Sequence, residues 1–272
     1  MMASVKEIIT KWYKTLGFPE IYDNEFYRAL DTYDVDEGAK FEDYDVKCED
    51  GKKNLLHFLY FSKALSEKYK AMGIPEDILL DTLSDIVVWT NTWREVKGEM
   101  YLGQLDWLSH HFAQRLYKLG RLQYYRGKAP RDIPELGVNK GDSVLDIHIP
   151  ASGKLGREGC VDSLKRALDF FPKYYPDFDF KCFTCHSWLL DSKLKDYLPE
   201  RSNILSFAGL FREIHEDSDN ALIRYMFEWD TTVENIKDKT PKTSAAAKIK
   251  EAILRGESFH VTLGAIALDE VK

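Results

Sequence analysis

Hydrophobic positions recur at helical spacing through roughly the first hundred residues. In the opening segment they follow the i, i+3, i+4 pattern of a helix that stops at Gly17. Longer segments repeat the pattern on either side of Gly73, which separates two helices. The helices expected in this part cover residues 5–16, 24–31, 53–72 and 75–96, and a further helix at 104–118 belongs to the domain that follows. The pattern therefore predicts a helical N-terminal domain, with a boundary at residues 98/99.

The period changes after Gly120, where apolar and polar residues begin to alternate as in strands. The clearest strand is Ser-Val-Leu-Asp-Ile-His-Ile-Pro at 143–150. Strands are expected near 122–124 and at 143–150, 178–187, 221–229 and 258–268. Helices are expected between them at 160–172, 203–214 and 243–255. This alternation predicts an α/β or α+β domain over residues 99–272, built on a sheet flanked by helices.

A glycine-rich loop follows the strand at 143–150. Gly153, Gly156 and Gly159 allow tight turns and a close approach of a ligand to the backbone. The loop leads into a helix N-terminus, which attracts phosphate, and Lys154 and Arg157 add positive charge. The spacing matches neither the P-loop nor the dinucleotide-binding fingerprint. A phosphate-binding loop and a plain connection both remain open on spacing alone.

The same strand carries a carboxylate and an imidazole on one face. Residues two apart on a strand share a face, so Asp146 and His148 point away from the apolar residues between them. Such a pair can act as a general base, and it can equally be a hydrogen-bonded polar pair facing solvent.

The string Cys182-Phe-Thr-Cys185-His186 matches the attachment signal for c-type haem. Its position in a strand places the two cysteines on opposite faces, which does not suit haem or a redox dithiol. A structural zinc would need further ligand pairs at suitable spacing, and none is evident. The sequence therefore predicts buried thiols, and we expect no metal.

The charge of the chain is uneven. The net charge is −7, and residues 18–52 hold twelve acids against four bases. The acidic average argues against nucleic acid as a partner. No apolar run reaches the ~18 residues of a membrane-spanning helix. The four cysteines, without a secretory signal, indicate reduced thiols and a cytoplasmic location.

Four segments resemble a bacterial family of acyltransferase-domain proteins, which pair a helical N-acyltransferase N-terminal domain with a GNAT-like C-terminal domain. The segments are LYKLGRLQYY (116–125), SVLDIHIPASGKL (143–155), CHSWLLD (185–191) with SNILSFAGLF (202–211), and the stretch 240–256. The resemblance covers most of the chain and is densest from residue 116 to residue 256.

The resemblance implies that acyl-CoA inserts between the strand at 143–150 and a splayed neighbour at 178–187. It implies pyrophosphate binding by the loop that follows, whose residues are Ile149, Pro150, Ala151, Ser152, Gly153, Lys154, Gly156, Arg157 and Gly159. The base would be Asp146 or His148, and Tyr197 would protonate the leaving thiolate. Glu135, His186 and Ser187 would line the acceptor site.

The function expected from this resemblance is transfer of an acyl group, acetyl first, from acyl-CoA to an amine on a small molecule. A binding protein that holds acyl-CoA without turnover is the alternative, because fold does not determine function. A ligand-free interaction protein and a haem or redox protein are further alternatives.

Overall fold

The computed structural model describes residues 3–151 and 153–271. Contacts divide the chain into two compact units. One unit runs through Leu119 and includes Pro150 and Ala151. The other comprises residues 120–149 and the chain from Gly153 onward. Each unit is described by itself.

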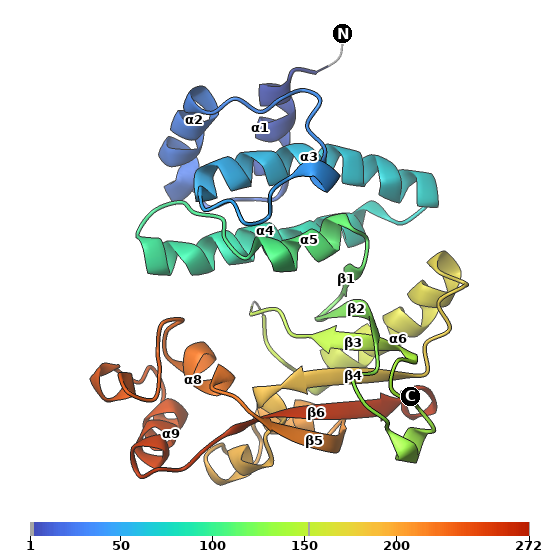
Figure 1. The fold of residues 1–272 in the computed structure, drawn as a ribbon, viewed down its shortest axis with the longest axis vertical. Helices are drawn as coiled ribbons and strands as arrows, with labels where there is room; N and C mark the ends of the chain where they lie inside the picture. The colour runs from blue at the N-terminus through green and yellow to red at the C-terminus, as the bar shows by residue number, and fades with distance from the viewer. Residues whose placement is uncertain (1–2, 152, 272) are drawn as a thin grey trace. The chain divides into compact units, whose positions relative to one another are not determined.

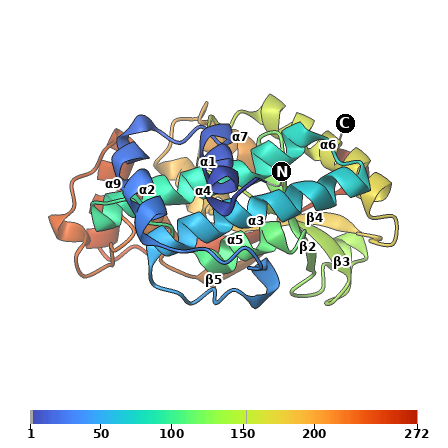
Figure 2. The ribbon, with the colours of Figure 1, turned by 90° about the horizontal axis from the view of Figure 1, so that it is seen from above.

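The first unit is helical, as predicted (Figures 1 and 2). Its α-helices are α1 (Val5–Thr15), α2 (Asp23–Thr32), α3 (Gly51–Met72), α4 (Glu76–Lys97) and α5 (Leu105–Phe112). A capping box formed by Ser4 and Glu7 starts α1, and the Asp50 carboxylate caps α3. Gly73, in the left-handed conformation, ends α3 so that α4 can turn back alongside it.

Aromatic rings fill the centre of this unit. The Phe58 ring meets the Phe112 ring edge-on at 5.0 Å, and Phe41 stacks on Phe112 at 5.2 Å. Phe58 and Leu59 of α3 are fully buried. The apolar stripe of α3 is therefore the core of the helical unit, and α4 and α5 pack against it.

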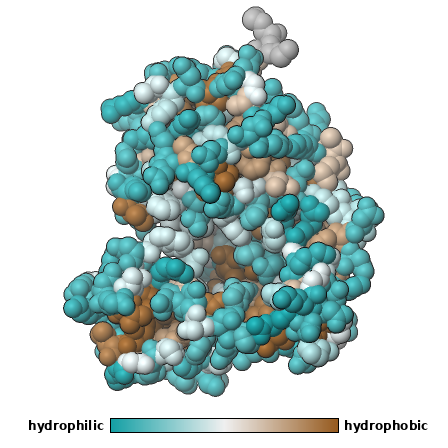
Figure 3. All heavy atoms as spheres, in the orientation of Figure 1, coloured by the Kyte–Doolittle hydropathy of each residue, from teal (hydrophilic) through white to brown (hydrophobic). Residues whose placement is uncertain are grey.

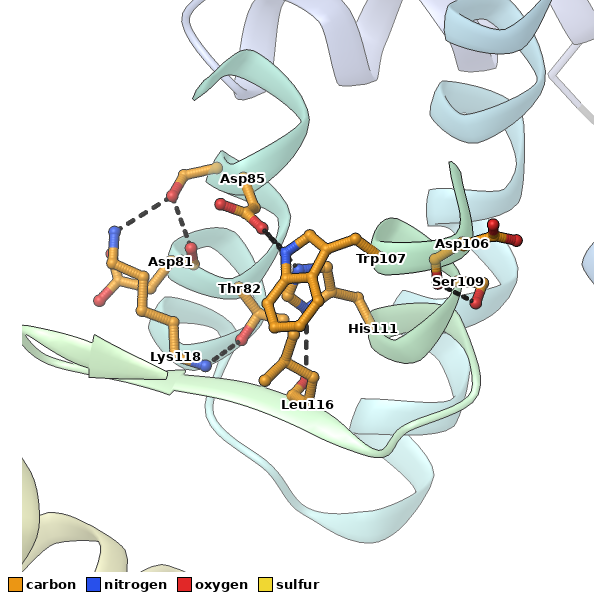
Figure 4. Close-up of polar contacts among 10 residues, drawn as sticks. Asp81, Thr82, Asp85, Asp106, Trp107, Ser109, His111, Leu116 and Lys118 are labelled. Atoms are coloured by element: carbon orange, nitrogen blue, oxygen red, sulfur yellow. Dashed lines mark hydrogen bonds and ion pairs between the residues drawn. The ribbon is translucent and has the colours of Figure 1, made fainter. Parts of the chain in front are cut away.

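A buried polar cluster joins α4 to α5 (Figure 4). Asp85 Oδ2 lies 3.0 Å from His111 Nε2 and accepts a hydrogen bond of 2.9 Å from Trp107 Nε1. His111 Nδ1 lies 3.3 Å from the Leu116 carbonyl oxygen in β1 (Leu116–Leu119). Asp85 is 3% exposed and His111 is fully buried, so this cluster sits inside the unit.

The second unit contains most of a mixed sheet. The strands are β1, β2 (Leu122–Lys128), β3 (Ser143–His148), β4 (Cys182–Ser187), β5 (Arg212–Ser218) and β6 (His260–Ala267). Their order in the sheet is β1-β2-β3-β4-β6-β5. Only the β3–β4 pair is parallel among the registers described, and the pairs β2–β3, β4–β6 and β5–β6 are antiparallel.

The sheet has two distinct faces in this unit. We call the first the helix face, because α6 (Arg157–Tyr174) covers it: Ser163 Oγ accepts hydrogen bonds from the Leu122 amide and the Tyr124 hydroxyl. Tyr124 on this face also contacts Phe183 at 5.9 Å. The opposite face carries Asp146, His148 and Thr184, and we call it the polar face.

The remaining helices of this unit form a second core beside the sheet. They are α7 (Asn203–Ala208), α8 (Ala221–Met226) and α9 (Ser244–Leu254), and α8 contacts β6. Buried residues of α8 and α9, such as Leu222 and Ile249, gather with Phe259. Hydrophobic surface also gathers over this region (Figure 3), where Leu254 is 54% exposed.

Three segments differ from the sequence prediction. Residues 221–226 form helix α8 where a strand was expected, and the helix expected over 203–214 ends at Ala208. The chain then forms β5, an edge strand that was not predicted. Likewise, the helix expected over 104–118 ends at Phe112, and β1 follows it. The mixed α/β fold class with a helical N-terminal part is confirmed.

None of the helices in the described chain combines the length and the apolar character that crossing a membrane requires.

Candidate active site

The strand β3 separates apolar from polar side chains as its sequence predicts. Leu145 and Ile147 are buried, with exposures of 0% and 1%. Asp146 and His148 are half-buried on the polar face. The alternation therefore anchors β3 by one face and presents a carboxylate and an imidazole on the other.

Asp146 and His148 contact each other. His148 Nε2 lies 3.0 Å from Asp146 Oδ2, and the Thr184 hydroxyl donates a hydrogen bond of 2.9 Å to Asp146 Oδ1. Thr184 is 1% exposed, so its hydroxyl fixes the Asp146 carboxylate from a buried position. In a neutral imidazole whose Nε2–H donates to Asp146, the other nitrogen carries the lone pair that accepts a proton. The contact orients the imidazole, and the role of His148 as a general base stays a prediction.

The register between β3 and β4 ends next to this pair of side chains. The register of β3 with β4 covers two pairs, Leu145 with Phe183 and Asp146 with Thr184. Beyond them, β3 continues to His148 and β4 continues to Ser187 with no register between the two strands. Strand ends without a mutual register offer main-chain donors and acceptors to an extended ligand.

The end of β4 places His186 and Ser187 on opposite faces. His186 lies on the polar face, where its Nε2 is 3.0 Å from Asp217 Oδ2 of β5. Asp217 Oδ1 also lies 3.3 Å from His215 Nε2. Ser187 lies on the helix face and accepts a hydrogen bond from the Leu189 amide. His186 therefore shares a face with Asp146 and His148, and Ser187 does not.

The loop after β3 turns at Gly153 and leads into α6, and phosphate binding by this loop stays a prediction. Gly153 adopts φ +84°, a left-handed conformation that favours glycine. A Cβ at Gly156 would meet nothing within 4 Å, so a ligand has room to approach the backbone there. Helix α6 begins at Arg157, three residues earlier than predicted, and its first amides point toward the loop.

The other predicted loop residues fall at the start of this segment. Ile149, Pro150 and Ala151 directly follow β3 in the chain, and Ser152 lies outside the described residues.

Two arginines hold the loop and α6 in place. Arg121 Nε donates 2.9 Å to the Lys154 carbonyl oxygen, and its Nη2 donates 3.3 Å to that of Gly153. Burial lowers the pKa of Arg121 from its usual value, and its Nη1 is buried without a hydrogen-bond partner among the described residues. Arg157 Nη1 donates to the Ser206 carbonyl oxygen of α7. Arg121 was missed from the sequence because it lies 32 residues before the loop.

Tyr197 and Glu135 contact other groups. The Tyr197 hydroxyl donates to the Glu257 carboxylate, which raises the pKa of Tyr197, and its ring lies 5.5 Å from Phe259. Glu135 is exposed in the turn Pro134–Leu136 between β2 and β3. Their assigned roles stay predictions.

The cysteines near the site are buried thiols. Cys182 lies on the polar face in an apolar cluster with Val144 and Ala265, and Cys185 lies on the helix face. Burial raises the pKa of Cys182 to about 11 and that of Cys185 well above the usual range. Thiols on opposite faces with raised pKa values suit packing and do not suit redox exchange.

The chain is similar to known proteins in sequence and in fold. The sequence matches the family described as a GNAT-like C-terminal domain over residues 116–266. It matches the family described as an N-acyltransferase N-terminal domain over residues 5–114. Among curated proteins, none matches the sequence.

Several solved structures share the fold. An acyltransferase in complex with CoA and 10C-teicoplanin has a TM-score of 0.77 at 19% identity, over 96% of this chain and 88% of that one. An acyltransferase variant in complex with octanoyl-CoA has a TM-score of 0.76 at 18% identity, over 95% of this chain and 87% of that one. An acyltransferase in complex with decanoyl-CoA has a TM-score of 0.70 at 23% identity, over 97% and 76% of the two chains.

Proposed function

Because the chain belongs to the family with a GNAT-like C-terminal domain, preceded by an N-acyltransferase N-terminal domain, we propose that it transfers an acyl group from acyl-CoA to an amine of a small acceptor. One observation carries the proposal. The β3–β4 register ends at Asp146 and Thr184, beside the imidazole of His148 and before a glycine-bearing loop that leads into α6.

We propose that the pantetheine arm lies along the parted edges of β3 and β4. Its amides would complete the hydrogen bonds that the two strands no longer make with each other. The pyrophosphate would rest on the amides at the start of α6, with positive charge from Lys154, Arg157 and the half-buried Arg121. Acyl-CoA is the only co-substrate this scheme needs.

The chemistry requires an uncharged amine next to the thioester. His148, oriented by Asp146, takes a proton from the acceptor ammonium group. The amine nitrogen then attacks the thioester carbonyl carbon, and the C–S bond of the tetrahedral intermediate breaks. As the C–S bond breaks, the nitrogen releases its second proton to solvent and becomes the amide nitrogen. The imidazolium of His148 returns its proton to the leaving thiolate, so one proton is released for each amide formed. Tyr197 is the alternative proton donor, and its hydroxyl would first have to leave Glu257.

The acceptor and the acyl length are the finer parts of the proposal. His186 and Asp217 lie on the polar face and would line the acceptor site, and the acidic stretch 18–52 favours a cationic acceptor. Acetyl is the acyl group expected from the sequence. Similar structures hold octanoyl- and decanoyl-CoA, so these are the competing donors to test.

The test is CoA release, measured with acetyl-, octanoyl- and decanoyl-CoA against a panel of amines. His148→Ala and Asp146→Asn should each lower turnover by ~10²-fold. Asp179→Asn, at an 82% exposed side chain of the same unit, is the matched control and should keep full activity. Equal rates for all variants would refute the assignment of the base. Saturable binding of CoA without release across the panel would favour a binding protein instead.

A further inference from the structure

We infer that Asp191, Glu216 and His260 form a binding site for a divalent transition-metal ion on the helix face of the sheet. Each of the three residues offers a ligand atom, and these atoms lie within 4.8 Å of one another. The inference does not rest on the proposed acyl transfer, whose dyad lies on the polar face.

The fold brings these residues together from three segments. β5 and β6 pair with Glu216 opposite Thr262, and His260 lies two residues before Thr262 on the same face. The turn after β4 closes over this face because Gly264 has no side chain. A Cβ at Gly264 would lie 2.8 Å from Leu190 Cδ1. Asp191, the next residue, is therefore held over the start of β6, where its Oδ2 accepts a hydrogen bond of 2.7 Å from the His260 amide.

The charges of the cluster call for a cation. Asp191 is 2% exposed, and Glu216 lies next to it. Within the described chain, neither carboxylate forms an ion pair with a lysine or arginine. The buried Asp191 carboxylate accepts hydrogen bonds from the Lys193 and His260 amides, and its negative charge is still repelled by that of Glu216. A bound divalent ion would offset the repulsion between the two carboxylates.

Two buried polar atoms at the cluster are unsatisfied. His260 Nδ1 and Thr262 Oγ1 are both buried without a hydrogen-bond partner among the described residues. Thr262 is fully buried, and it lies directly opposite Glu216. Buried polar atoms nearly always have partners, so two orphaned atoms beside two carboxylates indicate a missing ligand. Nδ1 of a neutral imidazole is a metal ligand, and the Thr262 hydroxyl can bond a water on the ion.

The donor set selects the kind of metal. One imidazole nitrogen with two carboxylates suits Zn²⁺, Mn²⁺ and similar ions better than Ca²⁺ or Mg²⁺, which prefer oxygen ligands alone. The ion would join the turn after β4 to β5 and β6, so its role is to stabilise this part of the unit.

The test uses the full chain, stripped with a chelator and dialysed against Zn²⁺ or Mn²⁺. We expect one bound equivalent and a rise in Tm of roughly 5 °C or more at saturation. Glu216→Gln keeps the size and shape of this exposed side chain. The variant should lose both the bound ion and the rise in Tm. Glu213→Gln is the matched control, because it changes an exposed carboxylate on the same strand and the same face.

A second control removes a competing cluster. Asp217→Asn disrupts the contacts with His186 and His215 on the polar face and should leave the bound equivalent unchanged. Electron spin echo spectra of the Mn²⁺-loaded protein should show coupling to a histidine nitrogen that His260→Asn abolishes. The inference is overturned if the wild-type chain binds neither ion, if Glu216→Gln retains the metal, or if only Asp217→Asn loses it.

Discussion

Replacing Asp85 by alanine tests whether the buried cluster between α4 and α5 holds the helical unit together. One carboxylate oxygen of Asp85 serves both His111 Nε2 and Trp107 Nε1 (Figure 4). Since Asp85 is 3% exposed and His111 is fully buried, water cannot replace the lost acceptor without local opening. The substitution therefore removes the acceptor of the buried His111 ring nitrogen and of the half-buried Trp107 Nε1.

The magnitude follows from these contacts. Each donor that loses its acceptor inside the protein costs about 1–3 kcal/mol, and Asp85 serves two of them. We therefore expect Asp85→Ala to lower the free energy of unfolding by about 2–6 kcal/mol. That is a large share of the ~5–15 kcal/mol that stabilises a typical domain. Asp85→Asn keeps an acceptor oxygen and should cost less, about 1–3 kcal/mol.

The assay is urea unfolding, monitored by tryptophan fluorescence and by circular dichroism. Both probes are used because the two units can unfold in separate transitions. Asp81→Ala is the matched control, because Asp81 lies one turn earlier on α4 and is exposed. It should change stability by no more than ~0.5 kcal/mol. If Asp85→Ala costs less than ~1 kcal/mol, or no more than the control, the cluster does not stabilise the unit as argued.

Three further outcomes follow from the structure. Burial raises the pKa of Glu25, but hydrogen bonds from Arg94 and the Met100 amide outweigh it and hold the pKa below its usual value. The stability it adds is present above the unfolded pKa of ~4.3 and is lost as pH falls through the folded pKa. Glu25→Gln should therefore flatten the fall of Tm with acid, and an unchanged slope would contradict this. Gly264→Val should cost about 1–3 kcal/mol in a thermal melt, because its Cβ would lie 2.8 Å from Leu190 and Phe211, whereas Gly156→Ala, with open space, should not. Arg121→Ala should raise the Kd for CoA by about tenfold in calorimetry, and an unchanged Kd would exclude Arg121 from pyrophosphate binding.

Strong periodicity made the longest elements predictable. The helices α3 and α4 bury a continuous stripe, and β3 alternates without interruption, so their patterns match their structures. The sequence Ala-Leu-Ile-Arg-Tyr-Met of α8 is a short apolar run, which periodicity alone cannot assign to helix or strand. β5 is polar and lies at the sheet edge with a bulge between Glu213 and His215, so it lacks an alternating signal.

The candidate site was predictable only where it is local in sequence. The shared face of Asp146 and His148 and the turn at Gly153 follow from neighbouring residues. The contact of His186 with Asp217 depends on the strand order β4-β6-β5, which the sequence does not reveal. The sequence search for metal ligands considered only closely spaced residues, so it could not find the cluster of Asp191, Glu216 and His260, which come from three separate segments.

The register between β3 and β4 is the shortest described in the sheet, so the fewest paired positions hold its middle together. We call this boundary between β3 and β4 the seam. On one side β2 and β3 share six paired positions, and on the other β4 and β6 share six. Two pairs join these antiparallel blocks. An extended ligand bonded to both edges would act as an additional strand between the blocks. When such a ligand binds, amide hydrogen exchange should slow on both sides of the seam. The slowing should include residues whose own side chains do not contact the ligand.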